Sequence, residues 1–263
     1  MVDNHIHTKL CKHAEGNVFD YVEKAISLGI KEISFTDHIP LPNNFDLAHR
    51  MNFDDMDTYT RWIMRAQEKY PEIKIRCGIE ADFYEGFEEY TENFLSQYKF
   101  DVVIMSVHFL RHWPKGNWVF DYHFPNKSTE EIYGDYIFTL IKGINTGLFD
   151  VLGHLDIVKT PGDSLLNKNP SEVNQLLMAL KKSGMAIEIN TSGYRKNTGE
   201  PYPGLDWLPS IRENSIPLTI GSDAHHPDQV GLNFKSVYNK LKEENINKIV
   251  VFENRLQVER KIN

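Results

Sequence analysis

Short apolar, β-branched runs alternate with amphipathic stretches along the whole chain. This strand–helix repeat predicts a parallel sheet, and seven or eight units without a linker or low-complexity segment favour one α/β barrel domain over residues 1–263 rather than two domains. After a first strand that ends near His7, the strand-like runs are Glu32–Thr36, Ile73–Ile79, Val102–Val107, Val151–Gly153, Ala186–Ile189, Leu218–Ile220 and Lys248–Phe252. The helix-like segments include Asn17–Leu28, Asp54–Lys69, Thr129–Thr146 and Pro170–Lys182, and we expect N-caps at Ser128 and Asn169.

Polar, metal-competent residues fall where these strands end. Active sites of parallel barrels lie at this end, and a buried polar group without a partner is costly. We therefore expect these side chains to converge on a shared partner. They are His5 and His7 on the first strand, then Asp37 with His38, Glu80, His108, His154, Asn190, and Asp223 with His225.

Each of these motifs has a structural alternative when taken alone. A strand-end histidine can simply bond to backbone, and an Arg or Lys could neutralise a buried Glu80 as well as a metal could. The two imidazoles of His5-Ile6-His7 lie on the same side of an extended chain, which suits two ligands of one ion. Seven of the eleven histidines fall at or just after strand ends. That joint pattern indicates a metal centre.

The composition narrows the class of protein. The net charge is −8 and basic clusters such as Lys181-Lys182 are short, so the chain lacks the basic surface that grips nucleic acid. No apolar run approaches the roughly 20 residues of a membrane span, and the first residues do not resemble a signal peptide. Cys11 and Cys77 lie far apart, which favours two free thiols and a cytoplasmic location.

Several further residues have open roles. Cys11 is close enough to His13 to be a ligand, although a small loop residue is the better interpretation. Asp3 shares a face with His5 and could orient an imidazole or simply begin the strand. Four more histidines are assigned to the surface or the substrate pocket: His49, His112, His123 and His226. The surface is favoured for His49 and His123.

The order of these motifs resembles the PHP (polymerase and histidinol phosphatase) family, and within it the stand-alone histidinol-phosphate phosphatases. The resemblance spans nearly the whole chain, and none of the nine usual ligand positions is missing. It runs through DNHIHT, His13, SFTDH, GIEADF, SVHFL, VLGHLDIVK, EINTSGYR and GSDAH.

The resemblance implies a distorted (β/α)7 barrel that holds three divalent metal ions. By the family pattern the first ion is bound by His5, His7, Glu80 and Asp223, the second by His13, His38 and His225, and the third by Glu80, His108 and His154. Such ligands suit Zn, Mn or Fe, and the sequence does not choose among them. The implied nucleophile is a hydroxide held at the ions by Glu80, Asp223 and His225.

The resemblance also suggests the substrate, L-histidinol phosphate, which would yield L-histidinol and phosphate in histidine biosynthesis. Arg195 is the predicted phosphate clamp, with an exposed loop arginine as the alternative. Further predicted substrate contacts are Asn190, Asp82, Asp156 and Phe109, with Tyr84 as another candidate. No residue stands out as the general acid for the leaving alcohol.

Other functions remain open. A protein of this fold could act on another small phosphate monoester or on nucleic-acid ends. A metal-dependent amidohydrolase would usually carry a carboxylated lysine at a strand end, where this chain has none. A non-enzymatic metal-binding protein could keep the ligands. We expect a small phosphorylated metabolite as partner, no nucleic acid and no membrane, whereas the oligomeric state stays open.

Overall fold

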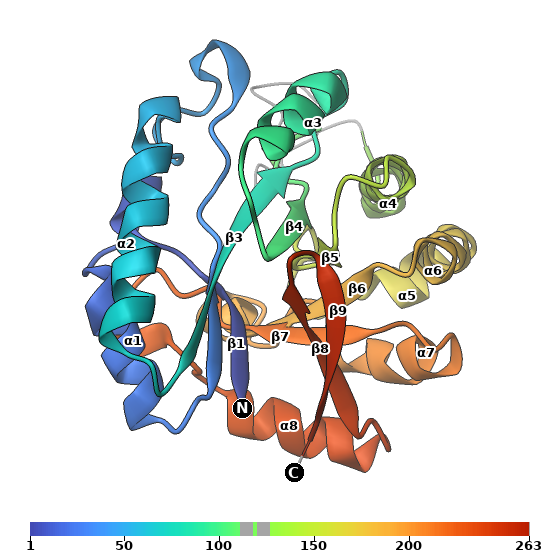
Figure 1. Ribbon diagram of the computed structural model, residues 1–263. Coiled ribbons are helices and arrows are strands. Elements are labelled where there is room, and N and C mark those ends of the chain that lie inside the picture. The colour runs from blue at the N-terminus through green and yellow to red at the C-terminus, as the bar shows by residue number, and fades with distance from the viewer. Residues whose placement is uncertain (111–117, 120–126, 263) are drawn as a thin grey trace.

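Seven parallel strands form the centre of the molecule in the order β1-β2-β3-β4-β5-β6-β7. The structure is a computed structural model and describes residues 1–110, 118–119 and 127–262. The strands curve into a nearly closed barrel (Figure 1), as the strand–helix repeat predicts. They are β1 Val2–Ile6, β2 Glu32–Phe35, β3 Lys74–Asp82, β4 Val102–Ser106, β5 Val151–Leu152, β6 Ala186–Asn190 and β7 Leu218–Gly221.

The barrel closes where the chain that follows β7 meets β1. The backbone N–H of His7 donates to the carbonyl of Ala224 over 2.9 Å, and the N–H of Asp223 donates to the carbonyl of His5 over 2.8 Å. Lower in the barrel, the Asn4 amide donates to the Thr219 hydroxyl over 2.6 Å. The predicted ligand segments of the first and last strands are therefore fixed directly to each other.

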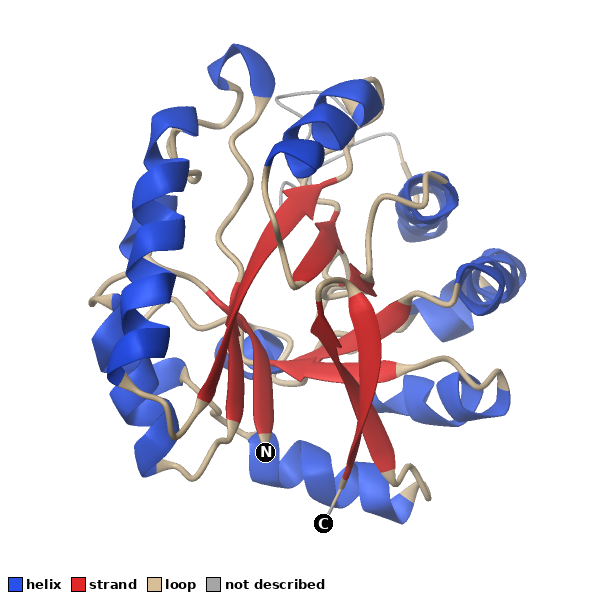
Figure 2. Cartoon of the chain, in the orientation of Figure 1, coloured by secondary structure: helices blue, strands red, loops and turns tan. Residues whose placement is uncertain are grey.

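Helices cover the outside of the barrel (Figure 2). Ser128 caps its helix as predicted and forms a capping box with Glu131. Asn169 precedes α6, but its side chain does not cap that helix and instead donates to the carbonyl of Glu130 over 3.0 Å. The helices are α1 Val18–Ser27, α2 Met56–Lys69, α3 Glu88–Gln97, α4 Thr129–Asn145, α5 Leu165–Lys168, α6 Pro170–Ser183, α7 Leu208–Glu213 and α8 Phe234–Glu243.

The last strand-like run does not join the barrel, so of the seven or eight units that the sequence left open the barrel has seven. It forms β8 (Lys248–Glu253), which pairs antiparallel with β9 (Leu256–Lys261). Asn254 and Arg255 between them both have positive φ, the backbone of a tight hairpin turn. Val250 and Phe252 pack on residues at the strand starts, and this hairpin closes that end of the barrel: Val102, Ile104, Val151 and Ala186.

The boundary of β3 also differs from the prediction. The strand continues past Ile79 to Asp82 because Ala81 and Asp82 pair with Met105 and Ser106 of β4. Glu80 therefore lies within the strand rather than at its end. Since side chains alternate along a strand, Glu80 and Asp82 lie on the same face, which the site uses.

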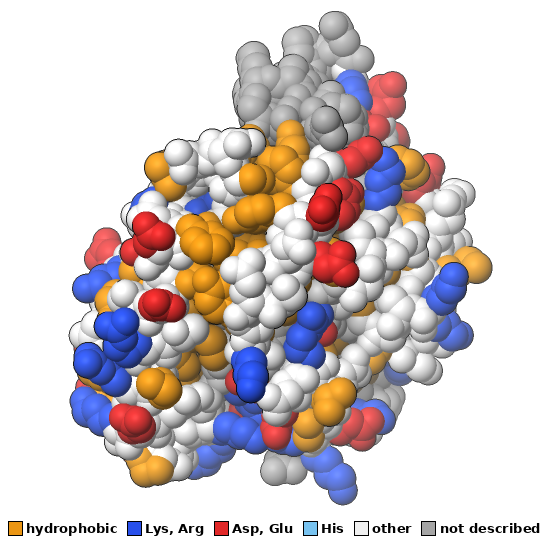
Figure 3. All heavy atoms as spheres, turned by 45° about the horizontal axis from the view of Figure 1, so that its top comes forward, with side chains coloured by type: hydrophobic (Ala, Val, Ile, Leu, Met, Phe, Trp, Pro, Cys, Tyr) orange, Lys and Arg blue, Asp and Glu red, His pale blue; other side chains and the backbone are white. Residues whose placement is uncertain are grey.

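Basic and acidic side chains are interspersed over the face shown in Figure 3. Several basic side chains pair with carboxylates, as Arg76 does with Glu32 and Lys168 with Glu130. Within the described ranges, no helix has both the length and the apolar composition needed to cross a membrane.

Candidate metal centre

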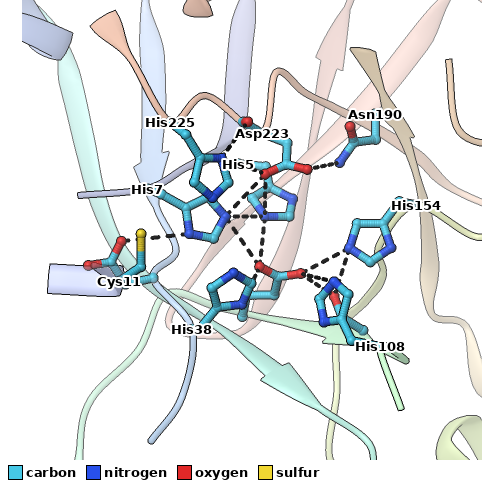
Figure 4. Close-up of polar contacts among 12 residues, drawn as sticks. His5, His7, Cys11, His38, His108, His154, Asn190, Asp223 and His225 are labelled. Atoms are coloured by element: carbon cyan, nitrogen blue, oxygen red, sulfur yellow. Dashed lines mark hydrogen bonds and ion pairs between the residues drawn. The ribbon is translucent and has the colours of Figure 1, made fainter. Parts of the chain in front are cut away.

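All nine predicted metal ligands lie together at the carboxyl ends of the barrel strands. The labelled histidines in Figure 4 turn toward a common centre, with Asp223 among them. A cavity of about 430 Å³ opens above this ligand cluster. The members of the ligand cluster are His5, His7, His13, His38, Glu80, His108, His154, Asp223 and His225.

One group of donor atoms belongs to β1, β3 and the segment after β7. The Nε2 atoms of His5 and His7 lie 3.0 Å apart, and each is 3.2 Å from Oε2 of Glu80. Oδ1 of Asp223 lies 3.2 Å from Nε2 of His7 and 3.8 Å from Nε2 of His5. Four electron-rich groups in such a small buried volume require a cation or protons between them.

Glu80 directs its two carboxylate oxygens toward different imidazoles. Oε2 faces His5 and His7 and lies 3.0 Å from Nδ1 of His38. Oε1 lies 3.0 Å from Nε2 of His154 and 3.9 Å from Nε2 of His108. One carboxylate is therefore placed to serve two cation sites at once.

A further group of imidazoles lies toward the cavity around His225. The His225 ring lies 4.1 Å from that of His7 and 4.5 Å from that of His13, between ring centroids. Its Nδ1–H donates to the carbonyl of Asp223 over 3.0 Å. Its Nε2 is buried and has no hydrogen-bond partner in the part of the chain that the structure describes. Such an atom is available to a metal ion.

Cys11 is buried beside the imidazoles of His13 and His225, which is where a metal ligand would lie. Its sulfur forms a metal-competent triad with His13 and His225, with donor atoms within 4.8 Å of one another. The sulfur also lies within 4.8 Å of donor atoms of His7 and Asp37. Both cysteines of the chain are unpaired, as predicted.

The electrostatics place the carboxylates and two of the imidazoles in their metal-binding forms. Burial alone would raise the pKa of Glu80, but the charge of His5 and hydrogen bonds from His154 and His38 hold it well below its usual value. Burial would also raise the pKa of Asp223, but the charge of His5 and a hydrogen bond from His7 hold that pKa well below its usual value. Burial lowers the pKa of His38 to about 3 and that of His225 well below its usual value. Ionised carboxylates and neutral imidazoles are the forms that bind metals.

Two buried carboxylates behind the cluster fix the orientation of its imidazoles. Glu188 of β6 accepts from Nδ1–H of His5 over 2.7 Å, which leaves Nε2 of that ring facing the cluster. Asp82 does the same for His108 over 3.0 Å. The sequence prediction missed Glu188, although an acidic residue inside the apolar run AIEIN was a usable signal. Asp3, a candidate for this role, instead accepts from the backbone N–H of Ser222 and Gly231.

The backbone around the cluster is shaped for close approach. A Cβ on Gly221 would lie 2.1 Å from Oε1 of Glu188 and 2.5 Å from Cβ of His5, so only glycine leaves space for their contact. His154 and Asp223 both have positive φ, at 25° and 51°. Strained backbone of this kind is typical of functional sites.

Arg195 is the predicted substrate contact that lines the cavity. Its Nη2 donates to the carbonyls of Ser222 and Asp223 over 2.9 Å each, which holds the guanidinium in place. Its Nη1 is buried without a hydrogen-bond partner among the described residues. That free donor suits an anion in the cavity, and the role of clamp stays a prediction.

The other four predicted substrate contacts already have partners in the fold and do not line the cavity, so a role toward the substrate stays a prediction for each of them. Asn190 donates to Glu188 over 3.0 Å and to Asp223 over 3.3 Å. Asp156 pairs with Lys159 over 3.1 Å, and Asp82 holds His108. The Phe109 ring packs between Phe45 and Trp118, and Tyr84 contacts that aromatic group through Phe45. Nearness to a ligand in sequence does not place a side chain in the cavity.

One wall of the cavity comes from a loop that the sequence prediction left aside. Asp46, His49 and Arg50 line it together with Trp118. His49, expected at the surface, is half exposed but faces the cavity. The side chain of His226 is exposed, which agrees with the first of the two predicted locations, the surface or the substrate pocket. His112 and His123 lie outside the described residues.

The residues present fit a cluster of divalent ions. Several sets of three donors lie within 4.8 Å of one another, among them His5–His7–Glu80 and His7–His38–His225. Imidazole and carboxylate donors suit Zn, Mn and Fe. A bound ion would also give the buried Nε2 of His225 the partner that it lacks among the described residues.

Comparisons with known proteins identify relatives along nearly the whole chain. Residues 3–192 match the family model described as PHP domain. A Deinococcus radiodurans protein named "Probable histidinol-phosphatase" is 35% identical over 245 residues, which cover 92% of this chain and 93% of that protein. The Bacillus subtilis histidinol-phosphatase is 30% identical and covers 89% of this chain and 97% of its own length.

A solved structure shares the fold. The histidinol phosphate phosphatase of Lactococcus lactis, crystallised with zinc, L-histidinol and phosphate, superposes with a TM-score of 0.83 at 24% identity. The match covers 98% of both chains. At this identity the likeness supports the barrel fold.

Proposed function

The chain belongs to the PHP domain family, and on that premise we propose that it is a metal-dependent phosphomonoesterase that hydrolyses L-histidinol phosphate to L-histidinol and phosphate. The two curated relatives named above carry the names "Probable histidinol-phosphatase" and "Histidinol-phosphatase", and the matches cover 93% and 97% of their lengths. A phosphoric monoester hydrolase needs a nucleophile and relief of charge on the phosphoryl oxygens.

One observation carries the proposal: the carboxylate of Glu80 faces imidazoles on both of its sides, beneath a cavity that a free guanidinium nitrogen of Arg195 lines. A single structural ion would not need nine converging ligands. A protein that merely stored metal would not need an anion-binding group beside them.

The ligand cluster supports three divalent ions of Zn, Mn or Fe, grouped as the family resemblance implies. When bound, the ions supply an activated water and offset the charge of the phosphoryl oxygens. The side chains around them act by position. Glu188 and Asp82 fix the ring orientation of His5 and His108, and Arg195 holds the phosphoryl group through Nη1.

Nucleic-acid ends are the rival substrate within the same family. The net charge of −8 and the interspersed charges of Figure 3 argue against it, because a phosphate backbone requires a basic track. A small phosphorylated metabolite fits the 430 Å³ cavity. Two unpaired cysteines agree with the proposed cytoplasmic location.

The test is phosphate release from a panel of metabolite monoesters after the protein is loaded with Zn, Mn or Fe. We expect L-histidinol phosphate to give the highest kcat/KM. The panel should include sugar phosphates, nucleoside monophosphates and 3′-phosphorylated oligonucleotides. A higher kcat/KM for any of these would replace the proposed substrate, and no release from any monoester would remove the proposed activity.

A further inference from the structure

The proposed reaction needs a proton donor that the ligand cluster does not supply. The leaving group is a primary alcohol, whose alkoxide is a poor leaving group unless its oxygen is protonated as the P–O bond breaks. We propose that His49, held by Asp46, donates this proton from its Nε2. This inference rests on the proposed function and adds a catalytic residue to it.

His49 is positioned with one nitrogen fixed and the other accessible. Its Nδ1 donates to Oδ1 of Asp46 over 2.6 Å, which fixes the ring and leaves Nε2 as the nitrogen that can reach the substrate. The side chain is 49% exposed and lines the cavity. Its ring lies 5.5 Å from that of His13 and 5.8 Å from that of Trp118, between centroids. The donor therefore stands beside the proposed metal centre.

Asp46 is itself held firmly by the fold. Its φ of 54° and the hydrogen bond from His49 N–H to its carbonyl, 3.1 Å long, form a tight turn. Nε of the buried Arg50 donates to Oδ2 of Asp46 over 3.0 Å. The same guanidinium pairs with Asp82 over 2.7 Å, and Asp82 holds His108. A chain of alternating charges thus ties the His49 loop to the ligand cluster.

The other polar groups of the cavity wall are poorer donors. Guanidinium groups do not give up a proton in proteins, so the arginines of the cavity wall are excluded as the acid. Burial raises the pKa of Tyr202, which makes its hydroxyl a weaker acid than a free tyrosine. Lys196 also lines the cavity, but lysine ammonium groups are weaker acids than imidazolium groups. Among the described residues that line the cavity, His49 is the one imidazole outside the predicted ligand set.

The step balances without a further reactant. The attacking water releases one proton to solvent as its oxygen bonds to phosphorus. The bond between phosphorus and the alcohol oxygen breaks, and its electron pair stays on the alcohol oxygen. The proton moves from Nε2 of His49 to the same oxygen and gives the neutral alcohol. His49 is left neutral against Asp46 and regains a proton from solvent through its exposed edge.

The dependence on the leaving group tests this role. In His49→Gln, kcat/KM for L-histidinol phosphate should fall about 10²-fold or more, the usual contribution of a general acid. For p-nitrophenyl phosphate, whose leaving group needs no proton, the loss should be only a few-fold. Asp46→Asn should show the same pattern with a smaller loss. Equal losses on both esters in His49→Gln would overturn the proposal.

Two further measurements separate proton donation from other roles. Bound metal per chain and the Kd of L-histidinol should match the wild type, because His49 neither binds metal nor needs to hold the alcohol; a loss of either would overturn the proposal. The control is His226→Asn, an exposed histidine near an aspartate that does not line the cavity, which should leave both rates unchanged. If wild-type protein does not hydrolyse L-histidinol phosphate, the proposed function fails, whereas the leaving-group comparison concerns His49 alone.

Discussion

Glu80 is the residue on which the arrangement of the site depends most. One of its oxygens lies 3.2 Å from Nε2 of His7, and the other lies 3.0 Å from Nε2 of His154, so its removal should loosen two ions together. His108 contacts the cluster from one side only. The two residues therefore make a matched pair for mutation.

We expect Glu80→Ala to lose two ions and His108→Ala to lose one, when both variants are assayed at equal added metal. The phosphatase rate of Glu80→Ala at neutral pH should fall by several powers of ten, because the activated water loses its paired charge. Metal analysis and phosphate release measure the two effects. Near-normal turnover with full metal content in Glu80→Ala would remove this residue from the centre of the site.

Arg195→Ala should weaken catalysis while bound metal stays unchanged. Its free Nη1 lines the cavity, but the guanidinium contacts the ligand segment only through backbone carbonyls. Loss of a charge-assisted contact to phosphate should cost about 1.5–3 kcal/mol, or roughly 10- to 150-fold in kcat/KM. Wild-type kinetics in this variant would make Arg195 a structural loop residue.

The candidate metal ligands at the strand ends could be predicted from the sequence. The residues that orient those ligands or line the cavity from a loop could not. His5, His108 and Asp223 stand out because polar residues interrupt apolar runs. Glu188 lies inside such a run, and only the fold shows that it reaches His5 on another strand. His49 lies in a loop whose course a periodic pattern does not predict.

At the scale of elements, the site depends on the contact between β6, β7 and β1. Glu188 reaches past Gly221 to His5, and its second oxygen accepts from the backbone N–H of His154 over 3.0 Å. One carboxylate thus orients a predicted ligand on β1, His5, and fixes the backbone of another predicted ligand after β5, His154. Supporting contacts of this kind typically affect metal affinity 10- to 100-fold.

Glu188→Gln should therefore weaken metal affinity roughly 10- to 100-fold, measured by competition with a chelator. At saturating metal most of the activity should return, which separates this variant from the loss of a ligand. Glu259→Gln is the control, since Glu259 is an exposed residue of β9 paired with Lys248. Unchanged metal affinity in Glu188→Gln would show that the His5 ring does not need its carboxylate.

The secondary-structure elements themselves were largely predictable, with errors where tertiary contacts decide. Pairing with β4 extends β3 to Asp82, which no local pattern indicates. The apolar run of β8 has the composition of a barrel strand, yet the Asn254-Arg255 turn folds it back onto β9. Its apolar side chains are buried in either arrangement, so composition alone does not distinguish the two.

At the scale of the whole molecule, the barrel core and the metal centre contribute separately to stability. The core runs through nearly every barrel strand and most helices, so the fold should survive removal of the ions. Any ion that binds only the folded chain adds RT ln(1 + [L]/Kd), about 2.7 kcal/mol at a hundred times Kd. Chelation should therefore lower Tm and leave a folded, inactive protein.

The most direct test of the central claim is a titration of divalent metal into chelator-treated protein, with bound metal and phosphate release from L-histidinol phosphate followed together. We predict no activity in the metal-free protein and full activity only when more than one ion is bound per chain. Full activity at one ion per chain or fewer, or in the presence of excess chelator, would contradict the account.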